Sequence, residues 1–332
     1  MAAAGTFNSV LGVLREVDVR PLRTAAEATF FIPFFSRDLP LAQHLVGLLY
    51  SGIRQQDIPS SRVCGAFLLN ASQPPRHMNA AVIITRADGD NTEELRQLHE
   101  LEQDGIRALV CLLGDSSESI PLRDQWLPAN QVVLNAPGGV LDDDQARHQL
   151  INAIRDLKVV DELSLARHLP AFRESASRSF ISDTAVANAV YSFGSGVLES
   201  NPVADIPLNV ADIVILTKNQ ALMAYKIALA MGLSSDFRQV MPQLAAVVGG
   251  GFLLRQTARG LVGLVPGFGL VPKVAVAFAG TYATGEIIHR WCAYGERVNK
   301  MTVRELYASA LTSGRTFART LLRRHNRQSP EV

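Results

Sequence analysis

The sequence is poor in cysteine. Its three cysteines, Cys64, Cys111 and Cys292, lie far apart, with no CxxC motif and no paired histidines nearby. An odd number of scattered cysteines argues against a disulfide framework and against a zinc site, and it is typical of a reducing cytosol. We therefore expect neither disulfides nor bound metal.

The chain also lacks a charge excess of either sign. Its formal net charge is +1, and charged residues make up 19% of it, fewer than the ~25% of an average soluble domain. Because nucleic-acid-binding domains usually carry a strong basic excess, we predict no nucleic-acid partner. The hydrophobic share of 48% favours a buried or membrane-touching segment.

Nucleotide-binding motifs are missing. No GK[ST] triplet occurs, and SRDLPLAQHLVGLL (36–49), which follows the first predicted strand, lacks the glycine-rich run and the lysine of a phosphate loop. TRAD (85–88) copies a guanine-reading TKxD only superficially, since two predicted strands still follow it. LLGDS (112–116), at the end of the penultimate predicted strand, where that motif belongs, keeps only its acidic residue, Asp115. We predict no cofactor and no GTP hydrolysis.

Other catalytic patterns are equally weak. The seven histidines are scattered and stand mostly in polar segments, so we expect them to be solvated. The acids of Asp142–Asp144 fit a helix start better than a metal cluster. We predict no catalytic or metal-binding residues and, most simply, a protein that is not an enzyme.

The first half alternates short apolar runs with helical segments. The runs TFFIPFF, VCGAFLLN, AAVIIT, IRALVCLLG and QVVLNAP begin at residues 29, 63, 80, 106 and 131. Strands that alternate with helices predict a mostly parallel sheet covered by helices, so we expect an α/β domain over residues 1–160. A helix capped by Thr92 should separate the third and fourth strands.

The second half, residues 161–332, predicts an apolar helical bundle of five or six helices. The run ADIVILTKNQALMAYKIALAMG (211–232) favours one long helix over a strand. VPGFGLVP (265–272) has two prolines and two glycines, which predict a turn between two apolar helices. Thr302 is expected to cap a last helix with a basic end. The first residues lack the pattern of a secretory signal.

No charge-free run in this half reaches the ~20 residues that a membrane-spanning helix needs. Ala275, Ala279 and Ala283 recur every four residues, which favours close helix packing. Two interpretations stay open for the apolar hairpin: a soluble bundle, whose cations pair with acids such as Glu286, or a hairpin that lies on or in one membrane leaflet. We favour the second, at the cytoplasmic side of the membrane, over a purely cytoplasmic protein.

Four segments carry a resemblance to a known family: TKNQALM (217–223), GFLLRQ (251–256), VPGFGLVPK (265–273) and AGTYATG (279–285). Together, over residues 180–295, they resemble the domain of unknown function 697 family, a helical module often fused to, or encoded beside, Era-like GTPases. The resemblance implies that the first half is an Era-like G domain of P-loop-NTPase-like strand order. The missing motifs imply that this G domain is degenerate.

These patterns lead to one hypothesis with two alternatives. We expect a non-catalytic adaptor or pseudo-GTPase that contacts the membrane surface or inner leaflet, or a partner GTPase. The alternatives are a GTP-binding protein that uses Ser36, Arg37 and Asp115, and a soluble homo-oligomeric scaffold assembled through alanine and glycine faces. The candidate interaction residues are Lys218, Asn219, Gln220, Arg255, Arg259, Gly267, Gly269 and Lys273. The cluster Lys218–Gln220 either fixes helix register or meets a partner.

Overall fold

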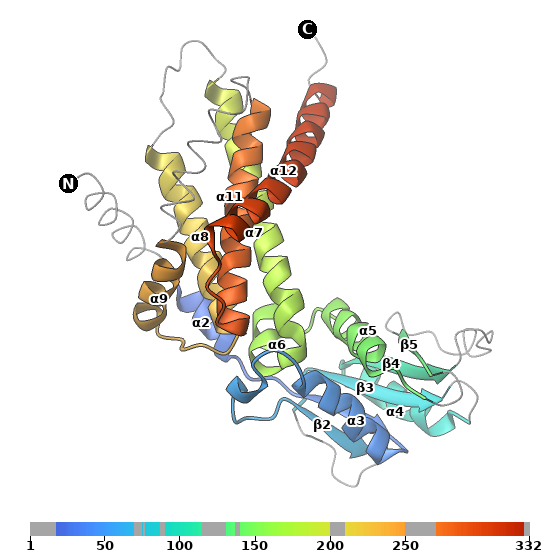
Figure 1. Cartoon of the computed structure of the whole chain (residues 1–332). Coiled ribbons are helices and arrows are strands. Elements are labelled where there is room, and N and C mark those ends of the chain that lie inside the picture. The colour runs from blue at the N-terminus through green and yellow to red at the C-terminus, as the bar shows by residue number, and fades with distance from the viewer. Residues whose placement is uncertain are drawn as a thin grey trace. The chain divides into compact units, whose positions relative to one another are not determined.

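The computed structural model describes residues 18–69, 75, 77–86, 90–114, 131–136, 140–199, 210–249 and 270–328. The chain divides into two compact units (Figure 1). The α/β unit contains residues 24–174 together with Ala230–Gly232, and the helical unit contains the remainder. The predicted boundary at residue 160 falls between helices α5 (Asp143–Asp156) and α6 (Glu162–His168).

The α/β unit is built on one parallel sheet of five strands in the order β2-β1-β3-β4-β5. The strands are β1 (Ile32–Ser36), β2 (Cys64–Leu68), β3 (Ala80–Arg86), β4 (Arg107–Gly114) and β5 (Gln131–Asn135). Every neighbouring pair is parallel. The predicted mixed α/β architecture is confirmed, because each apolar run became a strand.

Helices cover both faces of this sheet. Helix α4 (Thr92–Gln103) packs Leu98 and Leu101 against Phe35 and Ile83 on one face. Helix α3 (Leu39–Tyr50) contacts α5, and right-handed crossovers place α3 on the face opposite α4. Short helices complete the unit: the second half of α2 (Arg20–Glu27), η1 (Gln55–Asp57), α6 and η4 (Pro170–Phe172).

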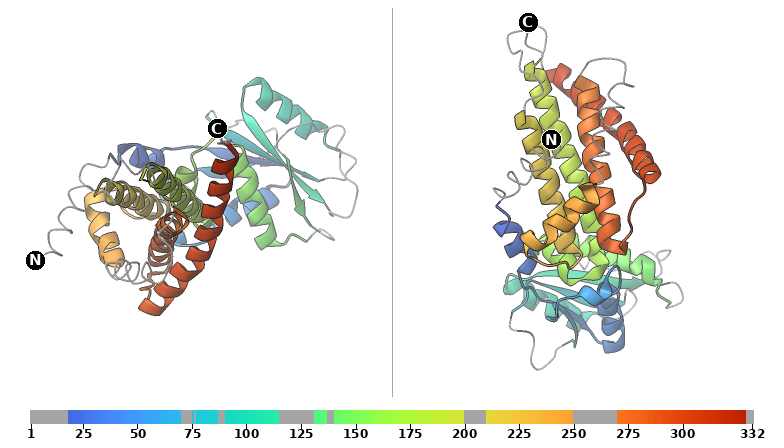
Figure 2. Two further views of the ribbon diagram at one scale, coloured as in Figure 1. Left: turned by 90° about the horizontal axis from the view of Figure 1, so that it is seen from above. Right: turned by 60° about the vertical axis from the view of Figure 1, so that its left-hand side comes forward.

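The helical unit is built from α7 (Arg173–Glu199), α8 (Val210–Ala230), α9 (Phe237–Gly249), α11 (Leu270–Tyr294) and α12 (Lys300–Gln328), except that the first two residues of α7 and the last residue of α8 belong to the α/β unit. Figure 2 shows α7, α8 and α11 side by side. The predicted long helix over 211–232 is confirmed as α8. Within the described residues, none of the helices combines the length and apolar character needed to cross a membrane.

Small residues let α11 and α12 approach closely. Ala275, Ala279 and Ala283 are fully buried, and a Cβ added to Gly314 of α12 would stand 2.8 Å from the carbonyl oxygen of Ala275. The predicted close packing is confirmed. Because α12 of the same chain covers the Ala275 face, that face is not available for the oligomer contact predicted for it.

Two local expectations are corrected. Asn91, and not Thr92, is the N-cap of α4, because Asp90 holds the Thr92 N–H and hydroxyl. Asn299, and not Thr302, caps α12, since its side-chain oxygen accepts from the N–H of Thr302 at 2.9 Å. Helix α11 begins at Leu270 and accommodates Pro272, because a proline in the first helical turn breaks no hydrogen bond. Most of the turn predicted at 265–272 lies outside the described residues.

Candidate functional site

Ligands of open parallel sheets bind where the strand order reverses, outside the carboxyl ends of the strands. Here that point lies between β1 and β3, which are neighbours although β2 separates them in sequence. The chain passes from the end of β1 at Ser36 into α3 through Arg37 and Asp38 alone. These residues therefore define the candidate site.

The N-terminus of α3 is already capped by a negative charge. The Asp38 carboxylate accepts from the N–H of Leu41 at 3.0 Å, and Pro40 in the first turn has no N–H to offer. The Ser36 hydroxyl accepts from the Asp38 N–H at 3.1 Å. A phosphate needs free backbone N–H groups at such a helix end, and this one presents a carboxylate instead.

Arg37 is engaged by the neighbouring helix. Its Nη2 lies 2.7 Å from a carboxylate oxygen of Glu94, whose side chain is only 4% exposed, and its Nε lies 3.5 Å from Glu93. A buried carboxylate is stable only when a cation or hydrogen bonds compensate it, so Glu94 keeps Arg37 in place. The Thr85 hydroxyl donates to the side-chain oxygen of Asn91, the residue that precedes α4. Asp115 lies outside the described residues.

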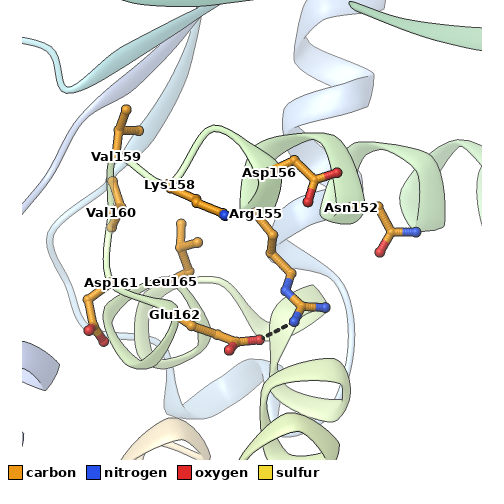
Figure 3. A pocket seen from close by; sticks show the side chains of 9 residues that line it. All are labelled: Asn152, Arg155, Asp156, Lys158, Val159, Val160, Asp161, Glu162 and Leu165. Atoms are coloured by element: carbon orange, nitrogen blue, oxygen red, sulfur yellow. Dashed lines mark ion pairs between the residues drawn. The ribbon is translucent and has the colours of Figure 1, made fainter. Parts of the chain in front are cut away.

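A pocket of about 600 Å³ lies at the junction of α5 and α6 (Figure 3). Its lining mixes acids and bases, and Arg155 faces Glu162 across it at 2.8 Å. Asp161 accepts from the N–H of Leu163 and so caps α6. Three of the lining charges thus serve an ion pair and a helix cap, and the lining contains no serine, cysteine or histidine.

The α/β unit is joined internally by Arg173, which is fully buried. Its guanidinium donates to the carbonyl oxygens of Ile53, Arg54, Asp57, Ala166 and Arg167. Burial lowers the pKa of Arg173 to about 10, so the group remains a cation at neutral pH. Gly232 belongs to the same cluster, since a Cβ there would stand 2.7 Å from the Asp57 carbonyl oxygen.

Two of the predicted interaction residues lie in a polar network inside the helical unit. Asn188 of α7 donates to the Thr281 hydroxyl of α11 at 2.9 Å and accepts from Asn219 of α8 at 2.7 Å. Gln220 donates to the same hydroxyl at 3.1 Å. Asn188 and Thr281 are at most 1% exposed, so this network holds three helices together. Asn219 and Gln220 match the register-fixing alternative.

The remaining predicted residues are dispersed. Lys218 is exposed on α8, and Lys273 is half-buried in the first turn of α11. Arg255, Arg259, Gly267 and Gly269 lie outside the described residues. Asn188, Thr281 and Arg173 were not among the predicted residues, because a polar residue in a helical segment gives no sign in the sequence that it is buried.

Comparison with protein-family models, curated proteins and solved structures finds no match to this chain. Its chemistry must therefore be inferred from its own residues.

The outer face of α12 is strongly basic. The helix carries seven lysine and arginine residues, Lys300, Arg304, Arg315, Arg319, Arg323, Arg324 and Arg327, against the single acid Glu305. All seven are exposed and, within the described residues, form no ion pair. Between them, Thr312, Thr316 and Thr320 each donate to the carbonyl four residues earlier. These threonines bond to the backbone of their own helix and add no charge to the basic face.

Several titratable groups are buried, contrary to the expectation that the histidines are solvated. His168 is 4% exposed and packs edge-on against Phe30, while His289 is 4% exposed in the helical unit. Burial lowers the pKa of His168, and the nearby cations Arg167 and Arg173 lower it further. Burial raises the pKa of the Cys64 thiol, which leaves it unreactive.

Proposed function

We propose that this protein is a non-catalytic adaptor whose α/β unit is a degenerate, P-loop-NTPase-like G domain that does not bind nucleotide. The observation that carries the proposal is the chemistry at the start of α3. The Asp38 carboxylate occupies the helix end where a phosphate would bind. Arg37, the only cation in that turn, is held by buried Glu94.

Electrostatics oppose a phosphate at this position. An anion there would face Asp38 at close range, and like charges repel by several kcal/mol when they are partly desolvated, on the order of 4 kcal/mol at 4 Å. Taking Arg37 from Glu94 would leave a buried carboxylate without its cation. Both effects disfavour the alternative of a GTP-binding protein that uses Ser36 and Arg37.

The test is a titration of the full chain with a fluorescent GTP analogue and magnesium. We expect no saturable binding to the wild type. The rival predicts tight binding that Asp115→Ala abolishes and that Glu94→Gln, which releases Arg37, strengthens. Saturable binding with that pattern would replace the adaptor by a nucleotide-binding protein.

We further propose that the adaptor contacts an anionic membrane surface through the basic face of α12. Arg315, Arg319, Arg323 and Arg327 recur every four residues, on the side of α12 away from its buried residues Gly314 and Ala318. Guanidinium groups bind phosphate groups through two parallel hydrogen bonds. Since the apolar side of α12 is packed against α11, the contact is electrostatic and needs no insertion.

Sedimentation of the full chain with lipid vesicles tests this contact. We expect binding to vesicles that contain phosphatidylglycerol, little binding to pure phosphatidylcholine, and loss of binding at high salt. Replacing Arg315, Arg319 and Arg323 by glutamine should weaken binding about a hundredfold, at about 1 kcal/mol per charge. Replacing the same three arginines by lysine keeps the positive charge and should preserve most of the vesicle binding. Equal vesicle binding by the wild type and the glutamine variant would move the membrane contact away from α12, and no binding by the wild type would favour the partner GTPase instead.

A further inference from the structure

The outer edge of β2 is unprotected. Strand β2 ends the sheet on one side, and within the described residues no strand pairs with its outer edge. Proteins usually block such edges with charges, prolines or bulges. The β2 sequence, CGAFL, has no charge and no proline.

The hydrogen bonds to β1 show which β2 groups point outward. Val63 accepts from the N–H of Ile32 at 2.9 Å, and the Leu69 N–H donates to Ser36 at 3.0 Å. In a parallel ladder, bonding to one neighbour alternates along the strand, so Gly65 and Phe67 bond to β1. The backbone groups of Cys64, Ala66 and Leu68 therefore face away from the sheet.

Only the first of these positions is satisfied within the described part of the chain. The Tyr50 hydroxyl accepts from the Cys64 N–H at 2.9 Å and donates to the Cys64 carbonyl at 3.3 Å. The outward N–H and C=O groups of Ala66 and Leu68 have no such partner among the described residues. A second extended strand is the structure that satisfies this spacing of donors and acceptors.

An exposed apolar side chain and a pocket large enough to hold one lie at the outer edge of β2. Leu68 is 50% exposed, although large apolar side chains are mostly buried in this chain. Beside it, a pocket of about 660 Å³ is lined by Ala66, by Gly47 and Tyr50 of α3, and by residues of the segment 58–62. A Cβ added to Gly47 would meet nothing within 4 Å, so there is space above Ala66.

We propose that β2 pairs antiparallel with β2 of a second copy of this chain, with Phe67 opposite the partner's Phe67. In this register Ala66 faces the partner's Leu68, and the outward N–H and C=O groups of both residues are satisfied in both copies. Directly opposite residues share a sheet face. Each Leu68 therefore lies over the other copy's Ala66, at the mouth of its pocket.

A second copy explains these features better than an unrelated peptide, because the exposed Leu68 side chain and the pocket that can hold such a side chain lie at the same strand edge. A two-fold axis through Phe67 uses the same surface twice, as in most homodimers. The pair merges the two sheets into one and removes both open edges. This inference is independent of the proposed adaptor function, so either can fail alone.

Light scattering and analytical ultracentrifugation of the full chain give the first test. We expect a monomer–dimer equilibrium. Ala66→Pro removes only an outward N–H, which an edge strand tolerates, and should raise the dissociation constant about tenfold or more, because each dimer loses two backbone hydrogen bonds. Leu68→Lys should act likewise. Val140→Lys, at a side chain 72% exposed, is the matched control and should dimerise normally.

Cross-linking tests the register. The paired Phe67 positions form a non-hydrogen-bonded pair with Cα atoms about 4.5 Å apart, within disulfide range. Phe67→Cys should give a covalent dimer under mild oxidation, whereas Leu68→Cys, which faces Ala66, should not. Cys64, Cys111 and Cys292 are buried and do not compete. A chain that stays monomeric, or a dimer insensitive to Ala66→Pro and Leu68→Lys, overturns the proposal.

Discussion

The side-chain amide of Asn188 donates to the Thr281 hydroxyl at 2.9 Å, between α7 and α11. Asn188→Leu would leave Asn219 without its acceptor in a buried site. We expect the free energy of unfolding to fall by about 1–3 kcal/mol, as measured by urea denaturation. Adding Thr281→Val to Asn188→Leu should cost less than the sum of the single changes, because both remove the same bond. Fully additive losses would show that the pair is not coupled.

Arg173 is predicted to be essential for the stability of the α/β unit. Arg173→Met leaves buried carbonyls without a donor, and we expect a loss of about 3 kcal/mol or more in thermal or urea unfolding. Arg173→Lys should also destabilise, since an ammonium group cannot reach the same spread of carbonyls. Arg20→Met is the control, because the Arg20 side chain is 87% exposed. If Arg173→Lys proved as stable as the wild type, this role would be contradicted.

The burial of His168 should make the stability of the fold depend on pH. The pKa of His168 is lowered in the folded state, so below the unfolded value of about 6.5 the unfolded chain binds more protons. Stability should therefore fall as the pH drops from neutral through that value. His168→Phe, which can pack on Phe30, should flatten this dependence, measured as the urea midpoint against pH. Val140→Thr, which changes an exposed side chain without adding or removing a titratable group, should leave the slope unchanged.

Replacing two helical glycines, Gly280 and Gly314, by alanine should have opposite effects on stability. Ala is the better helix former by about 0.5–1 kcal/mol, and a Cβ at Gly280 meets nothing within 4 Å, so Gly280→Ala should stabilise. At Gly314 the same Cβ would stand 2.8 Å from the Ala275 carbonyl oxygen and 3.1 Å from its Cα. Because that contact is with backbone, Gly314→Ala should lower the melting temperature. Stabilisation by both would mean that α11 and α12 can separate at little cost.

Much of the α/β unit could be predicted from patterns within a few residues of each other. Strands that are buried on both sides give continuous apolar runs such as AAVIIT, and such runs can be recognised in one sequence without its structure. The caps were harder. Asn91 and Thr92, or Asn299 and Thr302, are chemically suited to the same role, and only the path of the chain decides between them.

The candidate site followed a similar division. The missing glycines and lysine after β1 were visible in the letters, but the pairing of Arg37 with Glu94 joins the connection after β1 to helix α4, 57 residues further along the chain. Asn219 and Gln220 stood out as polar residues in an apolar helix. Their partner Asn188 did not, since a single asparagine in a helix is more often solvated.

The succession of strands and helices along the chain and the lack of a phosphate-loop motif were determined by the sequence itself, because periodicity and motifs are properties of residues close together in the chain. The tertiary structure alone decided that Arg173 collects carbonyls from two separate segments, that His168 is buried, and that the β2 edge is open beside a pocket. These features arise when distant segments meet, and burial, hydrogen-bond satisfaction and pKa all depend on what surrounds a group in space.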